Sequence, residues 1–256
     1  MKGSHWPPRH ALITGASSGI GRALAEALAG DGTRLTLLGR DRSRLSGVVD
    51  ACAKAGGTVR AQYVDVRDRA ALNHVVLDAD DGEPVDLLIA NAGVSGGTAK
   101  DGGRDLLAIN LQGVVDTVEP LVPRMLARGF GHVAVMSSLA GFKAMPNAPL
   151  YCASKAAVRS YGEALDARLR HRGVAVSVIC PGFVETPLTA ANPFAMPLLT
   201  SADEAAIRIL PGLRRRRARI AFPRRLYLLV RLLEVLPTGL VHAMLARTAA
   251  RGGAKE

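Results

Sequence analysis

The sequence predicts an α/β fold: a doubly wound parallel sheet of about seven strands, followed by a helical C-terminal extension. Short, strongly apolar runs alternate with longer segments whose apolar residues recur at helical spacing. The runs are apolar on both faces, as strands of a parallel sheet covered by helices on each side must be. A length of 256 residues suits one large domain. We therefore expect residues 1–256 to form a single domain, with an N-terminal arm at 1–9 and the extension at 224–256.

The predicted elements alternate along the chain. Segments such as 20–30 and 110–129 have the helical pattern, with glycine near their ends. Strands are expected at residues 11–14, 34–38, 59–64, 85–90, 132–137, 174–179 and 218–222. Ligands of such a sheet bind beyond the carboxyl ends of the strands, so the residues that follow each strand are the candidates for a site.

The positive charge of the chain is concentrated in its tail. The formal net charge is +11, yet residues 1–207 hold 21 Lys or Arg against 20 Asp or Glu, whereas residues 208–256 hold 12 against 2. The tail offers only Phe222 and Tyr227 as aromatic residues, so we do not expect a nucleic-acid surface.

Cysteine and histidine usage argues against a disulfide framework and against a metal site. The three cysteines are an odd number without C-x-x-C spacing, and none of the six histidines pairs with another His or Cys at metal-ligand spacing. The first residues lack the apolar core of a secretory signal, so a cytoplasmic location is expected.

A glycine-rich turn follows the first predicted strand in "ALITGASSGIGRALAEAL". Residues without Cβ let the backbone approach a pyrophosphate, and the helix that follows offers unpaired N–H groups to the anion. This placement predicts dinucleotide binding by residues of the turn, namely Gly15, Ser17, Ser18, Gly19, Ile20 and Gly21.

The end of the second strand favours NADP over NAD. An acidic residue there would bond the ribose 2′-hydroxyl of NAD, but Gly39 occupies that position and Arg40 follows it, which suits a 2′-phosphate. Arg22 and Arg42 are either supporting cations or solvated surface residues.

Further cofactor contacts are expected after the third and fourth strands. Asp65, next to Val66, is either an acceptor for the adenine amino group or a helix cap. "ANAG" places Asn91, Ala92 and Gly93 where the backbone could approach the cofactor.

Tyr151 and Lys155 in "YCASK" lie four residues apart at the start of a predicted helix, so both side chains project from one face. Such a pair can be a packed tyrosine beside a surface lysine, or a phenol held against a cation. Ser138, at the end of the fifth strand, would converge on the same cleft.

Six ordered motifs give the sequence a specific resemblance to the short-chain dehydrogenase/reductase family. They are T-G-x-x-x-G-x-G at 14–21, N-A-G at 91–93, Asn110 in "AINLQGV", S-S-x-A-G at 137–141, Y-x-A-S-K at 151–155 and P-G-x-V-x-T at 181–186. The resemblance spans residues 11 to about 190 and implies a Rossmann-like sheet.

The resemblance also implies roles for the residues of these motifs. Tyr151 would be the general acid/base, Lys155 would lower the pKa of the phenol and hold the nicotinamide ribose, and Ser138 would bond the substrate oxygen. Asn110 would hold a water beside the lysine, or would satisfy local backbone at a helix interruption, whereas Ser137 is expected to be structural. Contacts to the nicotinamide are expected from Pro181, Gly182, Val184 and Thr186.

The sequence departs from the family pattern at two places. Asn91 and Asn110 are only 19 residues apart, which is short for the family and leaves the usual tetramer in doubt; we expect a homodimer or a higher homo-oligomer. The tail is the second departure. Arg231, Glu234 and Pro237 make a membrane span unfavourable, so residues 214–246 are either a peripheral anchor on an anionic membrane or helices that close a dimer or cover the substrate pocket.

The leading hypothesis is an NADP-dependent oxidoreductase that interconverts a secondary alcohol and a ketone on a hydrophobic or lipid-like substrate. Residues 142–149 and 188–200 are expected to line its pocket. The alternatives are a membrane-associated NADP(H)-binding redox sensor with little turnover, and a relative that acts on an imine or enoyl bond.

Overall fold

The computed structural model describes residues 6–95, 104–190, 196–237 and 239–241 and contains one parallel sheet of seven strands. The strand order is β3-β2-β1-β4-β5-β6-β7, which confirms the predicted doubly wound sheet. The strands are β1 (His10–Thr14), β2 (Arg34–Gly39), β3 (Val59–Tyr63), β4 (Leu87–Ala90), β5 (Gly131–Met136), β6 (Val174–Pro181) and β7 (Arg219–Phe222). Each strand lies within two residues of its expected boundaries.

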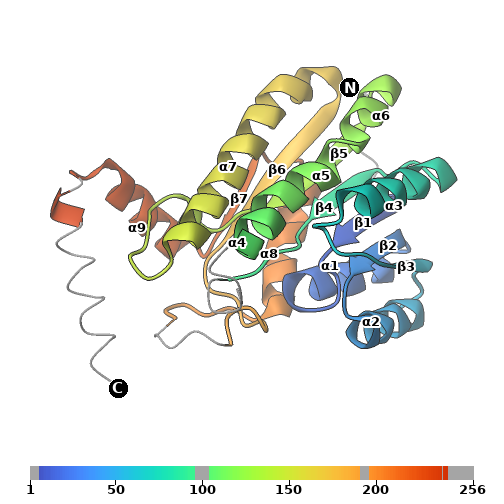
Figure 1. Ribbon diagram of the computed structural model, residues 1–256, viewed down its shortest axis with the longest axis horizontal. Coiled ribbons are helices and arrows are strands. Elements are labelled where there is room, and N and C mark those ends of the chain that lie inside the picture. Colours follow the sequence, from blue (N-terminus) through green and yellow to red (C-terminus); the bar gives the residue numbers. More distant parts are fainter. Residues whose placement is uncertain (1–5, 96–103, 191–195, 238, 242–256) are drawn as a thin grey trace.

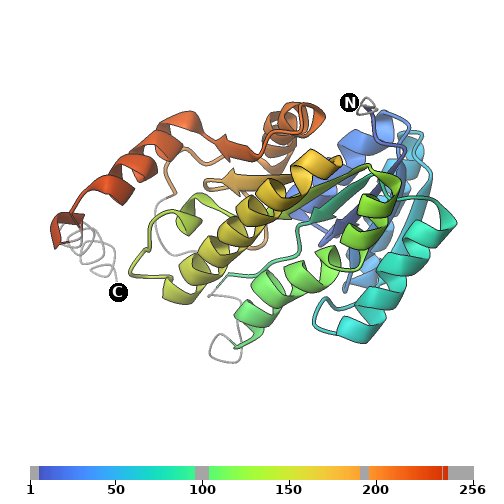
Figure 2. The same cartoon turned by 90° about the horizontal axis from the view of Figure 1, so that it is seen from above.

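Helices cover both faces of this sheet (Figures 1 and 2). One layer is formed by α3 (Arg69–Gly82), α4 (Arg104–Leu107), α5 (Gly113–Val118), α6 (Leu121–Arg128) and α7 (Pro149–Leu169). The other is formed by α1 (Gly19–Gly30), α2 (Arg42–Lys54) and α8 (Ala202–Arg214). Successive strand residues point to opposite layers: Leu12 packs into the core beside α3 and α5, and Ile13 into the core beside α1 and α8.

Short polar residues begin several of the helices. Asp41 precedes α2 and its side chain accepts a hydrogen bond from the backbone N–H of Arg44, and Ser201 caps α8 in the same way through Glu204. Gly129 ends α6 in the left-handed conformation, with a φ of 69°. These caps fix where each helix meets the end of the neighbouring strand.

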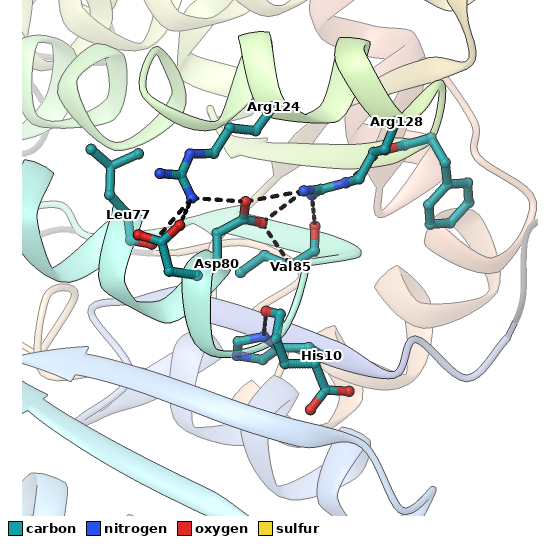
Figure 3. A network of polar contacts seen from close by, with 9 residues as sticks. His10, Leu77, Asp80, Val85, Arg124 and Arg128 are labelled. Atoms are coloured by element: carbon teal, nitrogen blue, oxygen red, sulfur yellow. Dashed lines mark hydrogen bonds and ion pairs between the residues drawn. The ribbon is translucent and has the colours of Figure 1, made fainter.

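A buried ion cluster joins α3 to α6 at the amino ends of the strands, away from the glycine turn (Figure 3). The Asp80 side chain is only 4% exposed and contacts Arg128 at 2.9 Å and Arg124 at 3.4 Å. It also accepts a 2.8 Å hydrogen bond from the backbone N–H of Val85, at the turn that leads into β4. Nearby, the His10 ring bonds the Glu83 carbonyl. The cluster therefore stabilises the framework that carries the cleft without taking part in the cleft.

The C-terminal extension begins as a helix, α9 (Arg224–Val235), directly after β7. Residues 242–256 of the expected extension lie outside the described residues. Within the described ranges, no helix is both long enough and apolar enough to cross a bilayer.

The structure separates the arginine run at 214–217 from α9. The run precedes β7, whereas α9 follows it, so the two lie at opposite ends of that strand. Arg216 donates to the Gly173 carbonyl at 2.9 Å, next to the first residue of β6. Within the expected membrane segment 214–246, the arginine run and α9 thus lie at opposite ends of β7, and the membrane contact itself stays a prediction.

Candidate active site

The carboxyl ends of the strands enclose a cavity of about 600 Å³. Residues from the ends of β1, β2, β4, β5 and β6 contribute to its wall, together with the start of α7. Most of the residues expected from the sequence line it: Gly15, Ser17, Ser18, Gly19, Ile20, Arg40, Val66, Asn91, Ala92, Gly93, Ser138, Tyr151, Lys155, Pro181, Gly182, Val184 and Thr186.

The glycine turn is shaped so that side chains are excluded from it. Gly15 and Gly19 have φ values of +65° and +54°, and a Cβ on Gly15 would lie 2.8 Å from the Ala92 Cα. Gly21 lines no part of the cavity; a Cβ there would meet the Gly15 carbonyl oxygen at 2.4 Å. The Asn91 amide donates to that same carbonyl at 3.1 Å, which fixes the turn against the end of β4. The turn opens at the N-terminus of α1, so it fits the pyrophosphate of a dinucleotide.

Two arginines reach the cavity at the end of β2. Arg40 was predicted there from the sequence. Arg44, in the first turn of α2, was not predicted. Each guanidinium has a carboxylate partner: Arg40 contacts Asp65 at 3.3 Å, and Arg44 contacts Asp41 at 2.6 Å. Helical spacing from the cap residue Asp41 is the signal that could have found Arg44.

Asp65 lies behind Arg40 and not in the cavity wall. Hydrogen bonds from Arg67, with the nearby charge of Arg40, lower the pKa of the Asp65 carboxyl to about 2. Its carboxylate is therefore ionised and occupied by guanidinium groups, and its predicted contact to adenine stays a prediction. The two supporting cations suggested by the sequence are also elsewhere: Arg22 pairs with Glu26 and Asp203, and Arg42 stacks on the Tyr63 ring at 4.6 Å.

Tyr151, Lys155 and Ser138 meet at the inner wall of the cavity. The Lys155 ammonium is buried, donates to the Met136 carbonyl at 2.9 Å and lies 5.7 Å from the centre of the Tyr151 ring. The Ser138 hydroxyl donates to the Pro181 carbonyl at 3.3 Å and accepts from the Ala140 N–H at 3.1 Å.

The pKa values of the pair are set mainly by burial. Burial raises the pKa of the Tyr151 phenol, and hydrogen bonding with Ser138 opposes this rise. Burial also lowers the pKa of Lys155 to about 8. The expected effect of Lys155, which is to lower the pKa of the phenol, stays a prediction; the largest influence in this structure is burial, which raises that pKa. Tyr151 is thus protonated at neutral pH.

Asn110 lies beside this group but outside the cavity wall. It belongs to a π-helical turn, Ala108–Gln112, between α4 and α5. Its carboxamide oxygen accepts from the Val94 N–H at 2.8 Å, and its nitrogen donates to the Val94 carbonyl and to Ser154. The side chain therefore satisfies local backbone, and its predicted role in holding a water at Lys155 stays a prediction.

Ser137 has the structural contact expected of it. Its hydroxyl donates to the Lys155 carbonyl at 2.7 Å, and the Arg159 guanidinium donates to the Gly141 carbonyl at 3.1 Å. The two bonds fasten the segment that carries Ser138 to α7, which carries Tyr151 and Lys155. The distance between the hydroxyl and the phenol is thereby set by the scaffold.

The segment after β6 forms the remaining wall. Thr186 packs over the glycine turn, since a Cβ on Gly19 would lie 2.8 Å from its Cγ2, and its backbone N–H donates to the Thr189 hydroxyl. Within the expected pocket segment 188–200, Leu188 and Thr189 line the cavity, and residues 191–195 lie outside the described residues. No residue of the other expected segment, 142–149, is among the lining residues of the described chain.

Several apolar lining residues were not predicted from the sequence: Leu38 and Met136 near the ends of β2 and β5, Ile109 in the π-helical turn, and Val64, Val94 and Pro187 in the segments that follow β3, β4 and β6.

Comparison with known proteins assigns this arrangement to a family. A sequence model of the family described as short chain dehydrogenase matches residues 9–195. An uncharacterised oxidoreductase of Myxococcus xanthus is 40% identical over 246 residues, which cover 93% of this chain and 97% of the relative. The chain belongs to the short-chain dehydrogenase/reductase family.

Solved structures of this family share its fold. A short-chain dehydrogenase/reductase of Burkholderia phymatum in complex with NAD matches with a TM-score of 0.78 and 30% identity, over 88% of this chain and 92% of that one. A short-chain dehydrogenase of Sphingobium yanoikuyae in complex with NADPH matches with a TM-score of 0.77 and 26% identity, over 96% of each chain. The protein is accordingly an NAD(P)-dependent oxidoreductase of the short-chain type.

Proposed function

We propose that the protein uses NADP(H) to interconvert a ketone and a secondary alcohol on a hydrophobic substrate. The observation that carries the proposal is the convergence of Ser138, Tyr151 and Lys155 on one wall of a cavity whose opposite end holds Arg40 and Arg44. A nicotinamide dinucleotide held along this cavity supplies the hydride.

Tyr151 is the proton donor in the reductive direction. Its raised pKa keeps the proton on the phenol oxygen until negative charge develops on the substrate oxygen. The Ser138 hydroxyl, held by its bonds to Pro181 and Ala140, fixes the position of that oxygen and stabilises its charge. In the oxidative direction Tyr151 takes the proton back.

Lys155 supplies a positive charge where no other cation among the described residues lines that wall. Burial of this ammonium is unfavourable, as its lowered pKa shows, and the single bond to the Met136 carbonyl leaves it other donors for the hydroxyl groups of a ribose. We assign it the orientation of the cofactor and the stabilisation of the phenolate.

The charged end of the cavity supports NADP(H). Among the described residues, Asp41 is the carboxylate of this cavity end, and it caps α2 and pairs with Arg44. The guanidinium groups of Arg40 and Arg44 each have a carboxylate partner but are 55% exposed, so a phosphate dianion can still bind them.

The apolar wall supports a hydrophobic substrate. Val94, Ile109 and Leu188 lie among the lining residues, and such a wall binds each buried methylene with about 0.8 kcal/mol. For a series of linear methyl ketones of increasing length, we expect kcat/KM to rise by up to about fourfold per methylene. If kcat/KM stayed constant along the series, the proposed hydrophobic substrate class would be wrong, whereas the proposed hydride and proton transfer would be unaffected.

Tyr151→Phe tests the chemistry itself. We expect turnover of a hydrophobic ketone to fall by about a thousandfold with NADPH affinity unchanged. Tyr161→Phe is the matched control, because this tyrosine lies on the same helix, outside the cavity wall, and its hydroxyl has no hydrogen-bond partner among the described residues. Retained turnover in Tyr151→Phe would overturn the assignment.

A further inference from the structure

The outer face of α9 carries a stripe of apolar side chains that no part of the described chain covers. Leu228, Leu229, Leu232 and Val235 are between 51% and 74% exposed. Their spacing places them on one side of the helix. Exposed apolar residues are common singly, but four on one face of a helix of 12 residues mark a contact surface.

The inner face of α9 is fastened to the catalytic body. Leu226, Tyr227 and Val230 pack against the core, and the Tyr227 ring meets the Phe142 ring edge-on at 5.5 Å. The Tyr227 hydroxyl lies 3.0 Å from the Arg219 guanidinium. The helix is therefore held in place by its inner face. The apolar residues of its outer face are not needed for packing against the core of the same chain.

The charge around the stripe is positive. Arg224 and Arg225 are exposed at the start of α9. Glu234, the only acidic residue between 224 and 255, is paired at 2.9 Å with Arg231 and at 3.6 Å with Arg159. A partner for this surface must therefore present apolar material together with negative charge.

The stripe lies at the same end of the sheet as the cavity. In Figures 1 and 2, α9 stands at the β7 edge of the molecule, where the strand ends carry the loops of the site. Four further apolar residues are exposed there: Met145, Leu198 and Leu199 in the segments that follow β5 and β6, and Leu150 in the first turn of α7. Leu150 immediately precedes Tyr151.

We propose that α9 docks the protein on the surface of an anionic membrane, with the leucine stripe in the acyl boundary and the arginines among the headgroups. Such a helix lies in the interfacial plane, with its apolar face immersed by about 5–10 Å. Docking in this orientation turns the exposed loops of the cavity towards the bilayer, from which a hydrophobic substrate can enter. The proposal does not depend on the substrate assigned above.

A second copy of the chain fits this surface less well. A stable interface takes about 20–30 residues from each partner, whereas the stripe offers four.

Co-sedimentation of the full chain with vesicles tests the proposal. We expect binding to vesicles of mixed phosphatidylglycerol and phosphatidylcholine, and much weaker binding to phosphatidylcholine alone. Arg224→Gln with Arg225→Gln should reduce the partition coefficient about 25-fold, since each basic residue near an anionic surface contributes about fivefold. Leu229→Asp with Leu232→Asp should reduce it by roughly tenfold or more.

Ile207→Asp is the control, because Ile207 is an even more exposed apolar residue on a different helix, α8. NADPH affinity should be unchanged in all variants, which shows that each is folded; if the leucine variant loses it, the arginine variant and a salt titration carry the test. Absence of vesicle binding, or binding that survives both α9 variants, overturns the proposal. A dimer in sedimentation velocity that only the leucine variant dissociates, without vesicle binding, would assign the stripe to a second copy.

Discussion

Removal of Arg40 should lower the affinity for NADPH and leave the affinity for NADH unchanged. The Arg40 and Arg44 side chains are each 55% exposed, so their interaction with a phosphate lies between the aqueous limit and that of a protein surface. At about 4 Å these limits are about 1 and about 4 kcal/mol per charge pair. Both guanidinium groups already neutralise carboxylates, Asp65 and Asp41, which places the value at the lower end.

We therefore expect about 1–2 kcal/mol for each arginine, or about 5- to 30-fold in the Kd of NADPH. Nicotinamide fluorescence on titration of NADPH and NADH into wild type, Arg40→Ala and Arg44→Ala measures both constants. Arg42→Ala is the control, since its guanidinium stacks on Tyr63 outside the cavity wall. Equal losses of NADPH and NADH, or an equal loss in the control, would refute the assignment of the 2′-phosphate site.

Three further predictions follow from the geometry. The pKa of Lys155 is about 8, so its positive charge is present below this pH and is lost above it. We therefore expect kcat/KM for ketone reduction to fall as the pH rises through about 8. A kcat/KM that stays constant up to pH 10 would contradict the role of the ammonium. Gly19→Ala should weaken NADPH binding by about tenfold while the fold survives in circular dichroism, because the residue has φ of +54° and the new Cβ meets Thr186. Asp80→Ala should lower the free energy of unfolding in urea by about 3 kcal/mol with the NADPH Kd unchanged, and a loss below about 1 kcal/mol would show that Arg128 finds another acceptor.

Local pattern was sufficient to predict the architecture of this protein. The central strands β1, β4, β5 and β6 are buried on both faces, which makes their sequences continuously apolar. All seven strands, including the partly buried edge strands β3 and β7, start within two residues of their expected positions. The glycine turn was also predictable from the sequence, because its positive φ values and close contacts allow few residues other than glycine.

Pairing between residues distant in sequence was not predictable. Arg22 does not line the cavity and pairs instead with Asp203 of α8, 181 residues later in the chain. The rise in the pKa of Tyr151 depends on how deeply α7 is packed, which no spacing encodes.

The tail shows the same limit. The strand expected at 218–222 is present as β7, and it places the arginine run and α9 at opposite ends, which the net charge of residues 208–256 did not indicate. The net charge of a segment does not show at which end of the sheet its charged residues lie.

The measurement that tests the central claim most directly is a single turnover of a hydrophobic ketone with NADPH deuterated at nicotinamide C4, followed by mass spectrometry of the alcohol. We predict one deuterium at the carbinol carbon with the wild-type protein, and none on the same time scale with Tyr151→Phe, although this variant binds NADPH normally. Failure of the wild-type protein to transfer deuterium to any ketone of the series, or equal transfer by Tyr151→Phe, would contradict the account.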